Sequence, residues 1–358
     1  TAANLTSAIL TSADLNGRDL TNVDFEKADL SGANLSGADL ENAILTGAKL
    51  ITDGTTSNNG FTDDASGTVN LSTAILTNAK LSKADLTGAN LTSAKLMGAD
   101  LTGANLTSTI LTSTDFSDTS TDGVVTAANL TSAILTSADL SGQDLTNVDF
   151  EKADLSGAVL TGATLTNAIL TGAKLITDGT NAVVMKGAIL TGAKLSKADL
   201  TGADLSTNTV PTTDVVTNLV GADLTGAILI DANLSDAILV DDTVGSKGAN
   251  LEKADLTGAT LSDTVFSVTH STTGVVTATN LTSAILIDAD LSSRDLTNVD
   301  FEKADLSGAN LSGATLTNAI LTGAKLITDG STGSNGTTTA AGAADTSGTV
   351  NLSTAILT

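Results

Sequence analysis

Leu or Phe occupies every fifth position over long stretches of this chain. Between residues 2 and 50 these positions are Leu5, Leu10, Leu15, Leu20, Phe25, Leu30, Leu35, Leu40, Leu45 and Leu50. An amphipathic helix places apolar residues three and four apart, and a half-buried strand places them two apart. A period of five fits neither, so the chain must turn once in every repeat. A small residue, usually Ala, stands two positions before nearly every one of these Leu or Phe residues, and we expect both to point inward.

Units of five residues cannot bury an apolar face alone, so they must stack into a coil. The repeat begins AANLT SAILT SADLN GRDLT and follows the pattern A-(D/N)-L-x-x over most of the chain. This pattern resembles the pentapeptide-repeat family. The resemblance implies an all-β fold, a right-handed quadrilateral parallel β-helix with four units per coil, and it implies no single function.

Larger blocks repeat on top of the five-residue period. The sequence of 1–50 returns nearly unchanged at 126–175 and at 277–326. Stacked repeats share one linear core, so the length of 358 residues does not require two domains. We therefore predict a single continuous β-helix solenoid over 1–358, with near-identical blocks that start at 1, 126 and 277.

The five-residue phase breaks at five places that are rich in Gly, Ser, Thr, Asn and Asp. Such composition is typical of surface loops. We expect exposed loops at about 52–67, 117–123, 206–216, 240–248 and 328–348. Two further irregular stretches keep the phase, and we interpret both as imperfect coil sides. They place Thr180, Met185, Ser271 and Val276 on the Leu positions.

In a coil of four units, residues 20 apart in the sequence stack on each other. Three acid–base pairs have that spacing: Asp29–Lys49, Asp154–Lys174 and Asp305–Lys325. We expect ion pairs there, each contributing about 0.2–1 kcal/mol. Long polar side chains also stand on the inward track of small residues, at Arg18, Gln143 and Arg294. Either those coil sides are looser, or these side chains bend outward along their stems.

No residue pattern indicates catalysis, a cofactor or a metal. His270 is the only histidine and the chain has no Cys, so a metal cluster or nucleophile relay lacks its partners. We expect His270 to be solvated. The pairs Asp63–Asp64 and Asp241–Asp242 could offer oxygen ligands to calcium, but we interpret them as solvated turn residues because no calcium-loop pattern surrounds them.

The Asn-Leu-Thr triplets at Asn4 and Asn129 arise from the repeat itself, so we do not interpret them as glycosylation sites. We therefore predict no catalytic, cofactor-binding or metal-binding residues and no cofactor.

The net charge limits the classes of partner. Lys and Arg number 16 and Asp and Glu number 40, which gives 16 − 40 = −24. This balance argues against nucleic acid and anionic membranes as partners. No run of 18 apolar residues is present, so no membrane span is expected. We predict a structural, non-catalytic rod, a secreted or cell-surface filament or spacer, with the cytoplasm as the alternative location.

The family resemblance supplies the main alternative function. Some pentapeptide-repeat proteins are acidic rods that mimic DNA and bind a topoisomerase such as DNA gyrase. About 18 coils at strand spacing make a rod of roughly 85 Å, and duplex DNA of that length carries about 50 charges. The net charge of −24 is about half of that. An adhesin or an ice-binding surface is a lesser alternative, since Glu26 and Glu41 interrupt the columns of Thr.

The sequence begins with TAANLTSAIL and ends with NLSTAILT, both made of ordinary repeat units. An uncapped β-helix exposes unpaired backbone N–H and C=O groups, which recruit another chain. A head-to-tail contact of this kind grows an open fibre. We therefore expect the partner to be a second copy stacked end to end, or flanking regions of a longer rod.

Overall fold

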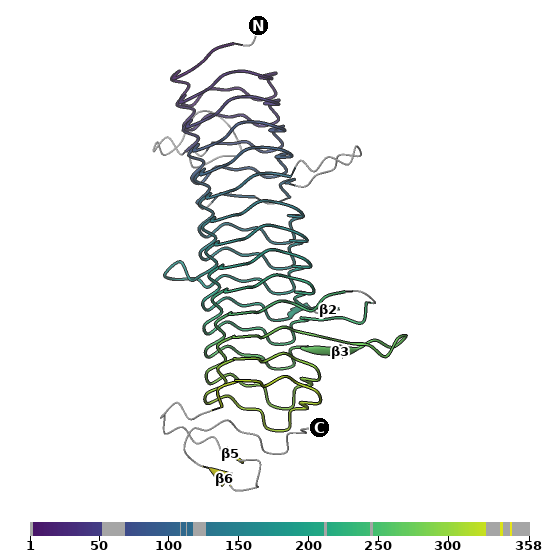
Figure 1. The fold of residues 1–358 in the computed structure, drawn as a ribbon. Coiled ribbons are helices and arrows are strands. Elements are labelled where there is room, and N and C mark those ends of the chain that lie inside the picture. The colour runs from purple at the N-terminus through teal and green to yellow at the C-terminus, as the bar shows by residue number, and fades with distance from the viewer. Residues whose placement is uncertain are drawn as a thin grey trace. The chain divides into compact units, whose positions relative to one another are not determined.

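Stacked turns of backbone make up most of the described residues in each unit of this chain (Figure 1). The computed structural model describes residues 3–51, 69–107, 109–111, 113–116, 127–210, 213–243, 246–326, 337–338 and 344–345. The chain divides into two compact units. Unit 1 is Thr1–Lys174 with Asp178–Asn181, and unit 2 is Leu175–Thr177 with Ala182–Thr358. The single continuous solenoid over 1–358 stays a prediction.

Parallel backbone bridges join each coil to the next within both units. In unit 1, Asn4 bridges Asp24 and Asp24 bridges Ile44, steps of 20 residues. Leu5 N–H donates to the Asp24 carbonyl at 2.7 Å, and Asp24 N–H donates to the Ala3 carbonyl at 3.0 Å. Bridging positions recur every fifth residue, so each coil carries four of them. The described residues contain no α-helix, which confirms the all-β prediction for them.

The core consists of the Leu or Phe track and the small-residue track, as the period of five predicts. From Phe25 to Leu50 every residue of both tracks is buried, and Leu30 and Leu35 have no exposed surface. The five Phe side chains that the structure describes fill Leu positions and are buried too. In the outermost described coils the Leu side chains are half-buried, or exposed as at Leu326, because only one neighbouring coil covers them.

Each corner is a tight turn that holds one residue in the left-handed backbone region. Ala8 N–H donates to the Leu5 carbonyl at 2.9 Å, and Ser7 between them has φ 57°. That conformation costs a residue with a side chain about 1–2 kcal/mol, whereas Gly adopts it freely. The same turn position therefore often carries Gly, as at Gly47 with φ 65°.

Bridges across the phase breaks keep the coils paired. Asn34 bridges Asn70, 36 residues away, where the ordinary step is 20. Asp100 likewise bridges Asn129. The predicted loops 52–67 and 117–123 themselves lie outside the described residues.

Three predicted loops contain described residues. In 206–216, β1 (Asn208–Val210) pairs antiparallel with β2 (Thr213–Val215), and the hairpin projects from the coils of unit 2 (Figure 1). In 240–248 most described residues are exposed or half-buried, but Val240 is fully buried, so the exposed segment starts one residue later than predicted. In 328–348 the structure describes only β5 (Thr337–Thr338) and β6 (Ala344–Asp345), an antiparallel pair.

The prediction that the stretch around Ser271 forms a coil side is wrong. The same prediction for the stretch around Thr180 is wrong in part. β3 (Ser267–Thr269) and β4 (Val276–Ala278) form an antiparallel hairpin, so Ser271 is exposed and Val276 is half-buried. In the other stretch Met185 is buried but Thr180 is exposed. Both inserts span a whole multiple of five residues. The Leu spacing therefore stays in phase on either side of them, although they are not regular coil sides.

Candidate functional site

Where the middle residue of a repeat is Asp or Asn, its side chain points outward and hydrogen-bonds to its own turn. Its Oδ1 accepts the backbone N–H two residues later, for example from Glu41 to Asp39 at 3.0 Å and from Thr257 to Asp255 at 3.0 Å. Where the later residue is Ser or Thr, its hydroxyl often donates as well, as from Thr225 Oγ1 to Asp223 at 2.6 Å. This is the Asx-turn geometry of Asp and Asn, which Ser and Thr reproduce more weakly. The repeat therefore selects these residues for the backbone.

These hydrogen bonds stabilise the ionised form of several carboxyl groups. Burial raises the pKa of Asp223, but hydrogen bonds from Thr225, Ser196 and Asn250 bring it below the usual value. The pKa of Asp178 is lowered further, first by the hydroxyl of Ser137 and then by the backbone of its own turn. Such carboxylates accept hydrogen bonds already and are poor candidates for general acids.

The three acid–base pairs predicted from the spacing of 20 are confirmed. The Lys Nζ to Asp Oδ2 distances are 3.9 Å for Lys49–Asp29, 3.3 Å for Lys174–Asp154 and 2.7 Å for Lys325–Asp305. The Lys side chains are 49–62% exposed. Exposed pairs of this kind contribute little to stability, so they stabilise the stacking register only weakly.

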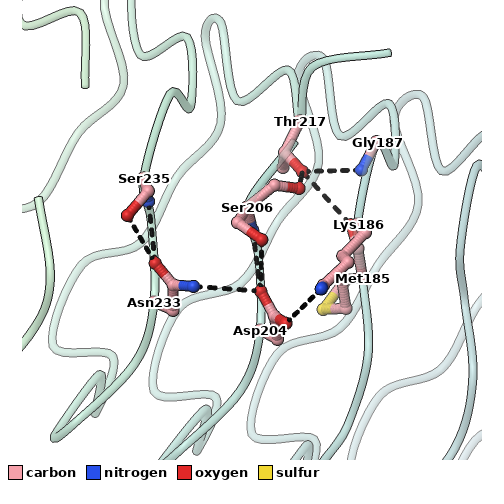
Figure 2. Close-up of polar contacts among 8 residues, drawn as sticks. All are labelled: Met185, Lys186, Gly187, Asp204, Ser206, Thr217, Asn233 and Ser235. Carbon is pink, nitrogen blue, oxygen red and sulfur yellow. Dashed lines mark hydrogen bonds and ion pairs between the residues drawn. The ribbon is translucent and has the colours of Figure 1, made fainter. Parts of the chain in front are cut away.

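A polar network surrounds Asp204 in unit 2 (Figure 2). Asp204 Oδ1 accepts the N–H of Ser206 at 3.1 Å and its hydroxyl at 2.6 Å, and Asn233 Nδ2 lies 3.4 Å away. Lys186 Nζ lies 3.1 Å from Asp204 Oδ2. Burial raises the pKa of Asp204, yet the hydrogen bonds and Lys186 hold it below the usual value.

Thr217 completes this network and has no exposed surface. Its hydroxyl accepts the Gly187 N–H at 3.0 Å and lies 3.2 and 3.1 Å from the carbonyls of Met185 and Ser206 (Figure 2). Thr217 stands on the small-residue track, where Ala is usual. Other buried Thr on this track also bond to carbonyl groups of the coil: Thr109, Thr114, Thr264 and Thr279. Sequence reasoning missed these hydroxyls, although the change from Ala to Thr was visible.

The outward-bending explanation holds for the long polar residues on the small-residue track. The Arg294 Nε donates to the Ser292 carbonyl at 2.9 Å, and Nη1 donates to Asp263 Oδ1 at 2.9 Å. Gln143 Nε2 likewise lies 3.5 Å from the Ser141 carbonyl, and Arg18 is exposed. Gln143 and Arg294 thus curl around their own corners instead of entering the core.

The prediction that His270 is solvated is wrong. His270 is 3% exposed, because the hairpin that sequence reasoning missed folds its ring against the segment around Asp242. Its Nε2 lies 2.6 Å from Thr277 Oγ1, and its Nδ1 lies 3.4 Å from Asp242 Oδ1. Asp242 is half-exposed and Asp241 half-buried, whereas Asp63–Asp64 lie outside the described residues.

Within the described ranges, no group of three His, Cys, Asp or Glu side chains is placed to hold a metal ion. The described residues also contain no helix that is long and apolar enough to cross a membrane. At Asn4 and Asn129, Oδ1 accepts the N–H of the residue two positions on, at 3.0 and 2.9 Å. The Asn of these triplets thus caps its turn.

Three solved structures illustrate what the chain is similar to. HetL, a pentapeptide repeat protein involved in heterocyst differentiation regulation from the cyanobacterium Nostoc sp. strain PCC 7120, is 26% identical, with 88% of this chain and 92% of HetL covered and a TM-score of 0.27. For trypsin-treated QnrB1, a plasmid-mediated fluoroquinolone resistance protein, the identity is 20%, the coverages are 63% and 92%, and the TM-score is 0.36. A pentapeptide repeat protein from the Arabidopsis thaliana thylakoid lumen is 26% identical, with 38% of this chain and 86% of that protein covered and a TM-score of 0.19.

No curated protein sequence matches this chain. The pentapeptide-repeat family pattern, in contrast, matches more than half of it, at residues 8–47, 69–92, 84–120, 126–162, 144–176, 181–206, 217–241, 247–267 and 295–327. With the stacked coils, the buried Leu track and the Asx-turns of the central Asp and Asn, this match shows that the chain belongs to the pentapeptide-repeat family.

Proposed function

We propose that this protein is a structural, non-catalytic scaffold, built as a right-handed quadrilateral β-helix and used as a filament or spacer. The observation that carries this proposal is the use of the carboxylates. Asp side chains in the middle of the repeat accept hydrogen bonds from their own turns in both units, as Asp39 and Asp255 do. Four bridging positions in each 20-residue coil support the four-sided cross-section.

The scaffold assembles end to end with further copies of itself in this proposal. Neighbouring coils recognise each other through parallel backbone bridges that recur along both units. The blocks at 1–50, 126–175 and 277–326 are nearly identical, so a coil edge of one copy matches the edges that already pair within another. Secretion or display at the cell surface is part of the proposal, and the lack of Cys is compatible with it.

Electron microscopy and sedimentation of the intact protein test the assembly. We expect particles that lengthen with protein concentration, and side-by-side bundles only at high salt, because each copy carries a charge of −24. Particles of monomer mass at every concentration would contradict the assembly. Inhibition of DNA gyrase by such monomers would favour the DNA-mimic alternative.

A single substitution separates end-to-end stacking from other association. Ile9 lies in the first described coil and is 81% exposed, and no described residue accepts its backbone N–H. Ile9→Pro removes this donor and should shorten the fibres, since Pro cannot extend a ladder. Ile9→Val keeps the donor and should assemble normally. Equal assembly of both variants would show that this edge takes no part.

A further inference from the structure

A buried imidazole fastens the β3–β4 hairpin of unit 2 to the segment that precedes it in the coil stack. Backbone bonds of 2.8 Å, from His270 N–H to Val275 and from Gly274 N–H to His270, close the hairpin. The His270 ring is buried, with Nε2 2.6 Å from Thr277 Oγ1. Its Nδ1 is also buried and has no hydrogen-bond partner among the described residues, although Asp242 Oδ1 lies only 3.4 Å away.

Ser271 adds two stronger contacts to the same carboxylate. Its N–H donates to Asp242 Oδ1 at 2.9 Å, and its hydroxyl donates to Asp242 Oδ2 at 2.7 Å. We call His270, Ser271, Thr277 and Asp242 the hairpin latch. The hydrogen bonds from Ser271, and then the charge of His270, hold the pKa of Asp242 below its usual value. Asp242 therefore stays ionised in mildly acidic solution.

A neutral His270 ring cannot donate hydrogen bonds to both of its neighbours, Thr277 and Asp242. A neutral imidazole donates from only one nitrogen. If Nε2 carries the hydrogen, the lone pair of Nδ1 faces the Asp242 carboxylate. If Nδ1 carries it, the distance of 3.4 Å to Asp242 is longer than an ordinary N–H···O bond. The imidazolium donates from both nitrogens, and each then faces an acceptor, Thr277 Oγ1 or Asp242 Oδ1.

Two carboxylates of a neighbouring segment lie near the His270 ring. Asp241 and Asp242, from the segment packed against the hairpin, both interact electrostatically with the ring. The hairpin residues 267–278 contain no other titratable side chain.

We propose that protonation of His270 tightens the hairpin latch, so that the β3–β4 hairpin is held more firmly in mildly acidic than in neutral solution. The outer end of the hairpin carries Val275, which is 58% exposed. Acidity then controls how rigidly this end is presented to a partner.

Amide hydrogen exchange of the intact protein at about pH 5.5 and about pH 7.5, the range in which His titrates, tests the latch. After correction for intrinsic exchange rates, the protection of residues 267–278 should be roughly tenfold higher at the lower pH, the gain expected from one charge-assisted hydrogen bond. Because the chain has one histidine, its imidazole ¹⁵N signals are unambiguous, and both nitrogens should be protonated where protection is high.

Two Asp→Asn variants complete the experiment. Asp242→Asn keeps an acceptor for Ser271 but removes the charge that faces Nδ1, and the pH dependence of hairpin protection should disappear. Asp231→Asn removes a charge from an exposed turn beside Gly258 in the same unit and should leave that dependence unchanged. Equal protection at both pH values in the natural protein would overturn the proposal, and so would a pH dependence that survives in Asp242→Asn.

Discussion

Replacing Asp39 by Ala and by Asn tests whether the central acid of the repeat serves the backbone. Asp39 is half-buried, and its Oδ1 accepts the Glu41 N–H at 3.0 Å. Ala removes this acceptor and leaves a half-buried N–H to water, which should lower the free energy of unfolding by about 0.5–1.5 kcal/mol. Asn keeps the acceptor and removes only the charge, so its cost should stay below about 0.5 kcal/mol.

Amide exchange and chemical denaturation measure the two changes. The Glu41 amide should exchange faster in Asp39→Ala but not in Asp39→Asn, because local opening is set by local hydrogen bonds. Lys80→Ala is a matched control, since Lys80 occupies the same outward position of another repeat and is exposed. Its cost should stay within about 0.5 kcal/mol. Equal costs for the Ala and Asn variants at Asp39 would refute the role of the Asx-turn.

Three further outcomes follow from the geometry. Leu30→Ala should cost about 2–5 kcal/mol in denaturation because Leu30 is fully buried, and a cost no larger than that of Asp39→Ala would contradict the inward Leu track. Gly157→Ala and Gly162→Ala both place Cβ at a positive φ, but only the first makes it overlap Asp178 Oδ2; exchange near Asp178 should rise in that variant alone. The lowered pKa of Asp204 stabilises the fold above its ordinary value of 3.8, and this contribution is lost as pH falls below it. Asp204→Asn should therefore lower the free energy of unfolding at neutral pH by less than about 1 kcal/mol, since its Lys186 partner is partly exposed, and thermal denaturation should converge with that of the natural protein in acid.

The regular coils could be predicted from the sequence because one short rule governs them. A Leu on every fifth residue determines which side chains are buried, and a step of 20 places Lys325 beside Asp305. The inserts could not be predicted in this way. The stretch around Ser271 keeps the five-residue phase by its length alone, and nothing in its composition separates a coil side from a hairpin.

The burial of His270 and the hydrogen bonds of Thr217 could not be predicted for a related reason. His270 is buried because a hairpin and a neighbouring segment meet across 28 residues of sequence, from Asp242 to His270, and no period connects them. In the sequence, Thr217 is only a Thr at a position where Ala is usual, and nothing there indicates a buried hydroxyl. Its role depends on which carbonyl groups lie next to it in three dimensions, and a sequence pattern does not reveal that.

The unequal bridge steps carry a consequence for how such a protein can change. Asn34 and Asn70 pair as closely as residues a single ordinary coil apart, although 36 residues separate them. Pairing between coils thus depends on the residues that form the backbone bridges, and it does not depend on how many residues lie between them. Segments can therefore be inserted, deleted or exchanged at a corner of this fold while the coils on either side stay paired. The cost is a loop-closure entropy that grows only by about 0.6 kcal/mol for each doubling of length.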